Sequence, residues 1–82
     1  MPPSSSSGRN ISGKRIAEAR SAAKPPLTQE DLSGRLALHG VLMDRAAVAK
    51  VENNLRRVLD YELKAVAEVL DVRVDWLLGG ER

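Results

Sequence analysis

The sequence predicts an all-α fold, a compact bundle of about five short helices. Apolar residues recur at spacings of three and four along several stretches, and no useful length alternates with the period of two that strands require. Capping residues, Gly or Pro stand at the ends of most of these stretches. A chain of 82 residues can hold one domain with one modest core, so we expect the helices to form a single bundle.

The composition is that of a globular protein, with 43% hydrophobic and 29% charged residues. Phe is absent, so the core must be built from Leu, Val, Ile and Ala. Cysteine is also absent, which removes disulfides and thiolate metal sites. Because no apolar run reaches about 18 residues, we expect no membrane association and a cytoplasmic setting.

Charge is unevenly distributed along the chain. Through Arg57 there are ten Lys and Arg against five Asp and Glu, a net charge of +5. From Val58 onward there are three against six, a net charge of −3, which gives the total of +2. A basic first part favours one face for a polyanion, although uneven charge is also common on solvated surfaces.

The first ten residues differ in composition from the rest. Pro2 to Arg9 contain two prolines, four serines and a glycine, and they offer no apolar area whose burial could offset the entropy of ordering. We therefore expect residues 1–10 to be a disordered Ser/Pro-rich tail and residues 11–82 to form the domain.

The first two helices are predicted from periodicity and from their ends. A helix over residues 12–23 is favoured until the Pro25-Pro26 pair, which cannot continue it. Thr28 can then cap a second helix over residues 28–38, with Asp31 placed to complete a capping box. Gly40 can take the left-handed conformation that ends it. Its predicted buried stripe is Leu32 and Leu36.

Three further helices follow. Asp44 is a candidate N-cap for a helix over residues 45–53, whose predicted inner face is Val48, Val51 and Leu55. Asp60 is predicted to cap a fourth helix, YELKAVAEVL, with Leu63, Val66, Ala67 and Leu70 buried. The segment VDWLLGG predicts a short fifth helix stopped by Gly79 and Gly80.

Three segments, LTQEDLSGRL, DRAAVAKVENNLR and DYELKAVAEVLDVRVDWLL, resemble in order the phage repressor/Cro family of helix-turn-helix domains, the xenobiotic-response-element type. The similarity covers residues 11–78. It implies a lambda-repressor-like domain that binds specific sites in double-stranded DNA as a bacterial or phage-type transcriptional regulator, with repression the expected mode. Residues 28–38 would brace residues 45–53, which would read the major groove.

The resemblance also implies site residues. Arg45, Ala46, Ala49 and Lys50 fall at base-facing positions, where Arg45 could bind guanine O6 and N7 and Lys50 could meet guanine or a phosphate. The alanines could touch a thymine methyl group, allow close approach, or simply be good helix formers. Phosphate-facing positions fall on Gln29, Asn53, Asn54, Arg56 and Arg57. For Gln29 the alternative is a solvated first-turn residue, and for the two arginines a solvated charge cluster.

Two further features bear on the recognition helix. In the family an Arg late in the first helix pairs with the Glu at the end of the recognition helix, which implies a structural pair between Arg20 and Glu52. Between Gln29 and Glu52 this chain is longer than the family usually is, so we expect residues 37–43 to form a longer helix end or a longer turn.

Other functions are less well supported by the residues. His39 is the single histidine, and no metal motif, phosphate loop or Ser/His/Asp grouping accompanies it, so we expect no enzyme, no metal and no cofactor. The main alternative is a helix-turn-helix fold used as a protein-interaction module, antitoxin-like or docking, since alanines read bases poorly.

A homodimer is a further hypothesis. A single module offers a reading surface of only roughly 600–1,000 Å², and the family habit is to bind paired half-sites. The candidate contact residues are Trp76, Leu77 and Leu78, for which the alternative role is to cap the core of the monomer.

Overall fold

The computed structural model describes residues 11–80, and these form an all-helical bundle without a strand. The all-α prediction is therefore confirmed. The predicted disordered tail, residues 1–10, lies outside the described residues. The helices are α2 (Ile11–Ala22), α3 (Gln29–Leu38), α4 (Arg45–Glu52), α5 (Asp60–Leu70) and α6 (Val74–Leu77).

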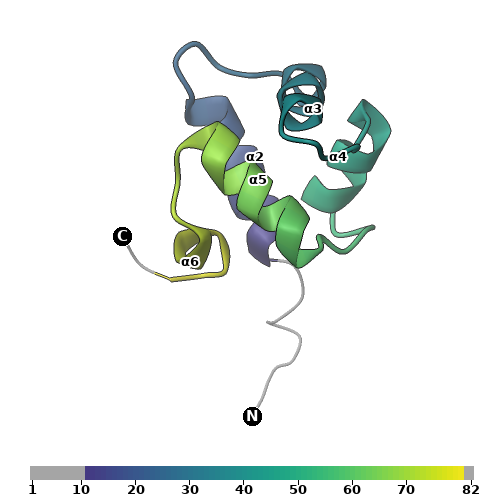
Figure 1. Ribbon diagram of the computed structural model, residues 1–82. Helices are drawn as coiled ribbons and strands as arrows, with labels where there is room; N and C mark the ends of the chain where they lie inside the picture. Colours follow the sequence, from purple (N-terminus) through teal and green to yellow (C-terminus); the bar gives the residue numbers. More distant parts are fainter. Residues whose placement is uncertain (1–10, 81–82) are drawn as a thin grey trace.

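The helices α2 and α5 pack against each other through the centre of the molecule (Figure 1). The pair α3 and α4 lies to one side of them, and α6 lies at the opposite end, against α2 and α5. Within residues 11–80, no helix is long and apolar enough to cross a membrane.

The core is aliphatic, as the absence of Phe requires. Every helix contributes to it, and the predicted inner residues of α3, α4 and α5 are buried, with the exception of Leu55. The buried hydrophobic residues are Ile16, Ala19, Leu27, Leu32, Leu36, Val41, Met43, Val48, Val51, Leu63, Ala65, Val66, Ala67, Leu70 and Leu77.

The start of α3 follows the predicted capping box. The Asp31 backbone N–H donates to Thr28 Oγ1 and the Thr28 backbone N–H donates to Asp31 Oδ2, both at 2.9 Å. These bonds satisfy two backbone donors that the first turn of a helix would otherwise leave open. Hydrogen bonds of Asp31 with the Thr28 backbone and with the Thr28 side chain lower the pKa of Asp31.

Four helices end in one recurring pattern. At the end of α3, Gly40 N–H donates to Ala37 O and Val41 N–H donates to Leu36 O, both at 3.0 Å, which is the Schellman arrangement. The ends of α4, α5 and α6 repeat it. The left-handed residues at these ends are Gly40, Asn54, Asp71 and Gly79, with φ of 79°, 66°, 57° and 104°.

Two predictions about these ends were wrong. Leu55 was expected on the inner face of α4, but 75% of it is exposed. The left-handed turn at Asn54 takes the chain off the helical path, so the spacing from Val51 no longer places Leu55 toward the core. Asp60 is not the cap of α5; it is the first helical residue, and the Glu62 carboxylate accepts the Leu59 backbone N–H at 2.9 Å.

The connection from α3 to α4 is the predicted longer turn. Helix α3 ends at Leu38 and α4 begins at Arg45. Within the turn, Val41 and Met43 are buried, whereas 87% of Leu42 is exposed. The turn is therefore held to the core at two points, one on each side of Leu42.

Helix α6 and the residues after it are bound to α2 through Arg15. The Arg15 guanidinium lies 4.9 Å from the centre of the Trp76 ring, and its Nη1 donates at 2.8 Å to the carbonyl oxygens of Trp76 and Gly80. Leu77 is fully buried, so of the two roles open to it the structure gives it the capping of the monomer core. Leu78 is 59% exposed.

Candidate nucleic-acid interface

The start of α4 is fixed by the predicted cap. The Asp44 side chain accepts the Ala47 backbone N–H at 2.8 Å, so its carboxylate satisfies one of the open donors of the first turn. The helix spans Arg45–Glu52, and Asn53, predicted as its last residue, is the C-cap.

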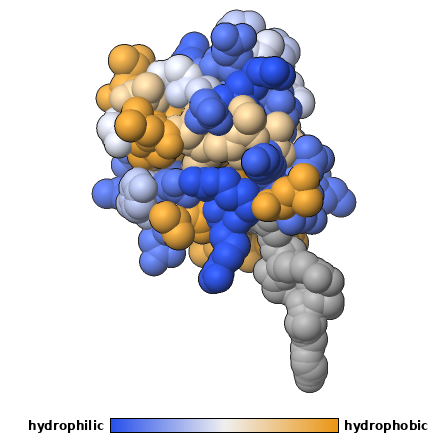
Figure 2. All heavy atoms as spheres, turned by 90° about the vertical axis from the view of Figure 1, so that its right-hand side faces the viewer, coloured by the Kyte–Doolittle hydropathy of each residue, from blue (hydrophilic) through white to orange (hydrophobic). Residues whose placement is uncertain are grey.

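The outer face of α4 carries all four predicted base-facing residues. Val48 and Val51 point into the core, while Arg45, Ala46 and Lys50 are exposed and Ala49 is half-buried. Positions three or four residues apart are neighbours on a helix surface, so these four side chains form one continuous face. Figure 2, which looks onto the side of the molecule that carries α4, shows hydrophilic surface around a pale, moderately hydrophobic area, with more hydrophobic patches at the edges.

The tilt of α4 is set by a network around Glu52. Arg20 donates Nε to Glu52 Oε2 at 2.8 Å and Nη2 to Oε1 at 2.9 Å, and its Nη1 donates to Leu27 O at 2.9 Å. The Glu52 side chain is only 5% exposed, and its hydrogen bond raises the pKa of Arg20. The predicted Arg20–Glu52 pair is confirmed, and it joins α2 to α4.

Gln29 belongs to the same network, which the sequence did not predict. Its Nε2 donates to Glu52 Oε1 at 3.0 Å. An amide nitrogen carries two hydrogens, so this bond uses one donor of the side chain. What remains for an external anion is the second amide hydrogen and the backbone N–H at the first position of α3.

The residues after α4 divide into two groups. Asn53 and Asn54 are exposed, with Asn53 Nδ2 donating to Ala49 O at 2.9 Å, and Arg57 is exposed. Arg56 instead turns inward. It donates Nη1 to Glu62 Oε1 at 3.0 Å and Nη2 to Oε2 at 2.9 Å.

Sequence reasoning missed Glu62, which is 2% exposed. The available signal was its place three residues after Leu59, where the carboxylate of a capping box stands. The hydrogen bonds from Arg56, and a further one from the Leu59 backbone, lower the pKa of Glu62. The same ion pair raises the pKa of Arg56, so Arg56 primarily positions the turn between α4 and α5.

Three cations on this side of the molecule have open donors. Within residues 11–80, the side chains of Arg45, Lys50 and Arg57 take part in no hydrogen bond or ion pair. The acidic residues nearest to them in sequence are Asp44, Glu52 and Asp60. Asp44 caps α4, and Glu52 is bonded to Arg20 and Gln29. Exposed cations without an internal partner, two on a capped helix and one after it, can bind anions without first breaking an internal contact.

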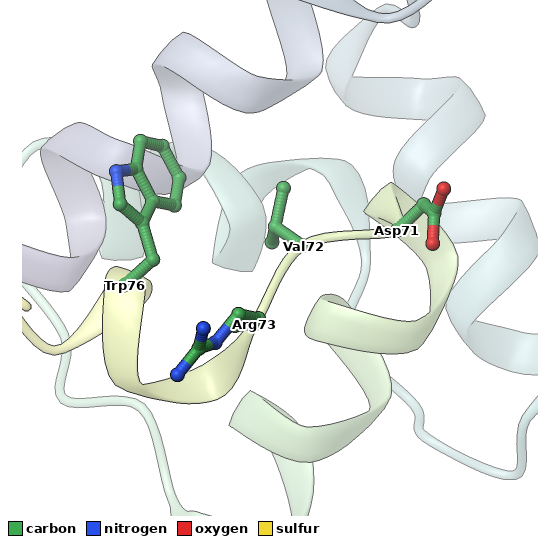
Figure 3. Close-up of a pocket in the computed structure, with 4 residues that line it drawn as sticks. All are labelled: Asp71, Val72, Arg73 and Trp76. Atoms are coloured by element: carbon green, nitrogen blue, oxygen red, sulfur yellow. The ribbon is translucent and has the colours of Figure 1, made fainter. Parts of the chain in front are cut away.

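Two other surface features, the surroundings of His39 and a depression beside α6, lie away from the face of α4. His39 Nδ1 lies 3.4 Å from Glu68 Oε1 on the surface, and no group of three or more His, Cys, Asp or Glu among the described residues could hold a metal ion. A depression between the end of α5 and α6 is lined by Asp71, Val72, Arg73 and Trp76 (Figure 3). Asp71 and Trp76 lie at its opposite ends, so this depression gathers no reactive group.

Comparison with models of protein families, with curated proteins and with solved structures finds no match for this chain.

Proposed function

We propose that this protein binds specific sites in double-stranded DNA as a bacterial or phage-type transcriptional regulator, acting as a repressor in the cytoplasm. In this proposal α3 and α4 are the two helices of a helix-turn-helix. The observation that carries it is the outer face of α4, where open cations flank small side chains on a helix whose position is fixed by a cap and a buried ion pair.

Base reading is assigned to four residues of α4. Arg45, in the first turn and exposed, can donate two hydrogen bonds to guanine O6 and N7, and Lys50 can meet a second base or a phosphate. Ala46 and Ala49 let the helix approach the floor of the major groove and can touch thymine methyl groups.

Phosphate binding is assigned to the residues at the edges of α4. Arg57, Asn53 and Asn54 lie beyond its C-terminal end, and the Gln29 backbone N–H stands at the start of α3, where the helix dipole favours an anion. Arg56 is left out of the proposed direct contacts because Glu62 holds its guanidinium.

Selection of bound sites from a random DNA library tests the proposal. We expect the parent protein to enrich one motif, because base-specific contacts discriminate by about 1–3 kcal/mol each. Arg45→Ala should relax the preference at one position of the motif, and Arg57→Ala should weaken binding to all sites alike. Arg73→Ala, which removes an exposed cation beside α6, is the matched control and should bind as the parent does. Failure to enrich any motif contradicts the proposal.

The proposal includes a homodimer, since a palindromic site would double the small reading surface of one copy. With Leu77 buried, the candidate contact is reduced to Leu78 and the partly exposed Trp76. Sedimentation at micromolar concentration with a selected palindromic duplex should show two copies per duplex. One copy per duplex at saturation would contradict the dimer.

A protein-interaction module is the second candidate, and exposed leucines favour it. Leu38 and Leu55 are 87% and 75% exposed, and apolar surface of this kind also marks protein contacts. The two candidates differ in their response to salt, because a docking surface built on apolar contacts responds little to salt, whereas DNA binding through phosphates weakens steeply.

A further inference from the structure

We propose that Leu42 is an additional specificity-determining residue, which contacts the C5-methyl group of a thymine beside the bases read by α4. This inference rests on the proposed function. It concerns the turn between α3 and α4, to which the proposed function assigns no base contact.

The first observation is how the turn presents Leu42. Its two neighbours, Val41 and Met43, are 3% and 5% exposed, whereas Leu42 is 87% exposed. Val41 is fixed further by the hydrogen bond from its backbone N–H to Leu36 O at 3.0 Å. Because the chain is anchored immediately before and after it, Leu42 is an apolar side chain held out toward solvent on a short, constrained segment.

The second observation is the hollow beside Leu42. It has a volume of about 450 Å³ and lies between the second half of α3, the turn and the first turn of α4. Most of its lining is apolar. The lining residues are Ser33, Ala37, Leu42, Met43, Asp44 and Ala47.

The third observation places this hollow next to the reading face. Ala47 lines the hollow, and Lys50, three residues later, is its neighbour on the surface of α4. Leu42 is also only three residues before Arg45. Arg45 stands at the N-terminal end of α4, and this is the end of the recognition helix that contacts base edges in the major groove of helix-turn-helix complexes. A base pair flanking those read by Arg45 and Lys50 would therefore lie over the hollow.

The chemistry of the hollow favours a base edge over the DNA backbone. Asp44 at its rim is an anion, which repels phosphate, while Arg45 and Lys50 next to it attract the duplex as a whole. Among the groups exposed in the major groove, the thymine C5-methyl is the apolar one. Leu42, together with Ala47, which also lines the hollow, offers that methyl group an apolar contact.

Duplexes in which single thymines are replaced by uracil test the inference, because uracil lacks only the methyl group. On a site selected from the random library, we expect one replacement to weaken binding of the parent by roughly fourfold, the value of one buried methyl or methylene group. Leu42→Ala should bind the thymine and uracil duplexes equally. Leu38→Ala is the matched control, since Leu38 is also a leucine with 87% exposure but does not line the hollow, and it should keep the fourfold difference.

Thermal unfolding of both variants should match the parent, because neither side chain is buried. If Leu42→Ala retains the thymine-to-uracil ratio of the parent at every position, or if no thymine methyl in the selected site matters, the inference is overturned while DNA binding stands. If no site is selected at all, the proposed function fails together with the inference.

Discussion

At the scale of single residues, the carboxylates of Glu52 and Glu62 organise the region around α4. Each accepts two hydrogen bonds from one arginine and a further one from a second group: Gln29 for Glu52, and the Leu59 backbone for Glu62. Both side chains are at most 5% exposed. Buried carboxylates whose oxygens all have partners hold neighbouring elements at fixed positions, which the reading role proposed for α4 requires.

A double-mutant cycle on Arg20→Met and Glu52→Gln measures the interaction free energy between Arg20 and Glu52. Each single change should lower the free energy of unfolding by about 2 kcal/mol, because it leaves a charged, largely buried partner without its hydrogen bonds. The double variant should lose less than the sum of the two, by about 1 kcal/mol or more. Urea unfolding of the four proteins provides the numbers.

The matched control is the pair Arg73 and Asp75, which has the same 2.8 Å separation but side chains 72% and 56% exposed. Arg73→Met and Asp75→Asn should be additive within about 0.5 kcal/mol. Equal coupling in the two cycles would mean that burial does not strengthen the Arg20–Glu52 pair.

The carboxylate of Glu62 should make the stability of the fold depend on pH. Because the pKa of folded Glu62 is lowered from the ordinary value of 4.5, the unfolded chain binds a proton more readily, and stability is lost as the pH falls through the folded pKa. As the pH falls below about 4.5, the urea midpoint should fall more steeply for the parent than for Glu62→Gln. Glu18→Gln, at an exposed position of α2, is the control. If Glu62→Gln and the parent have the same acid slope, the Arg56–Glu62 pair does not supply the linkage.

The two ion pairs differ in how far they could be foreseen. The Arg20–Glu52 pair was implied by resemblance, because its partners stand at known places in neighbouring helices. The Arg56–Glu62 pair was not predicted, since nothing in the local pattern shows that the chain turns back after Asn54 and brings Arg56 over the start of α5. Arg56 and Arg57 look alike in the sequence, and only the folded turn separates a positioning residue from an open cation.

At the scale of elements, the helix ends decide both the boundaries and the exceptions. Capping residues Thr28 and Asp44 and the terminator Gly40 were predicted because their side-chain chemistry, or its absence, acts locally. The exposure of Leu55 was not predicted. The apolar spacing in the sequence continues past Asn54, but the left-handed conformation of Asn54 ends the helix before Leu55. Asp60 was assigned as a cap by residue type, whereas the bond that caps α5 comes from Glu62.

Two glycines, one inside α3 and one just beyond its end, test this reading in opposite directions. Gly34 lies within α3 with open space where a Cβ would stand, so Gly34→Ala should raise the free energy of unfolding by about 0.5–1 kcal/mol. Gly40 also has open space, but its φ is +79°. Gly40→Ala should therefore lower the free energy of unfolding by about 1–2 kcal/mol, because only its backbone conformation is unfavourable for alanine. A stabilising Gly40→Ala, measured by urea unfolding, would contradict the left-handed termination of α3.

At the scale of the whole molecule, α4 and the turn after it place Arg45, Lys50 and Arg57 on the exposed surface. The all-α class follows from helical periodicity, absent strand alternation and local stop signals, which are properties of the chain that packing does not override. The positions of Arg45, Lys50 and Arg57 relative to the long turn depend on how Val41 and Met43 anchor it. That arrangement is set by tertiary packing, so the sequence could predict a longer turn but not which of its residues faces solvent.

Salt dependence of binding to a selected duplex tests the central claim, DNA binding by the face of α4, most directly. The logarithm of the association constant should fall linearly with the logarithm of salt concentration, with a slope of about −0.9 per phosphate neutralised. Arg57→Ala should make this slope shallower by about 0.9, while Arg73→Ala leaves it unchanged. Binding that does not respond to salt, or a slope that is the same in Arg57→Ala as in the parent, would contradict the proposed role of this face.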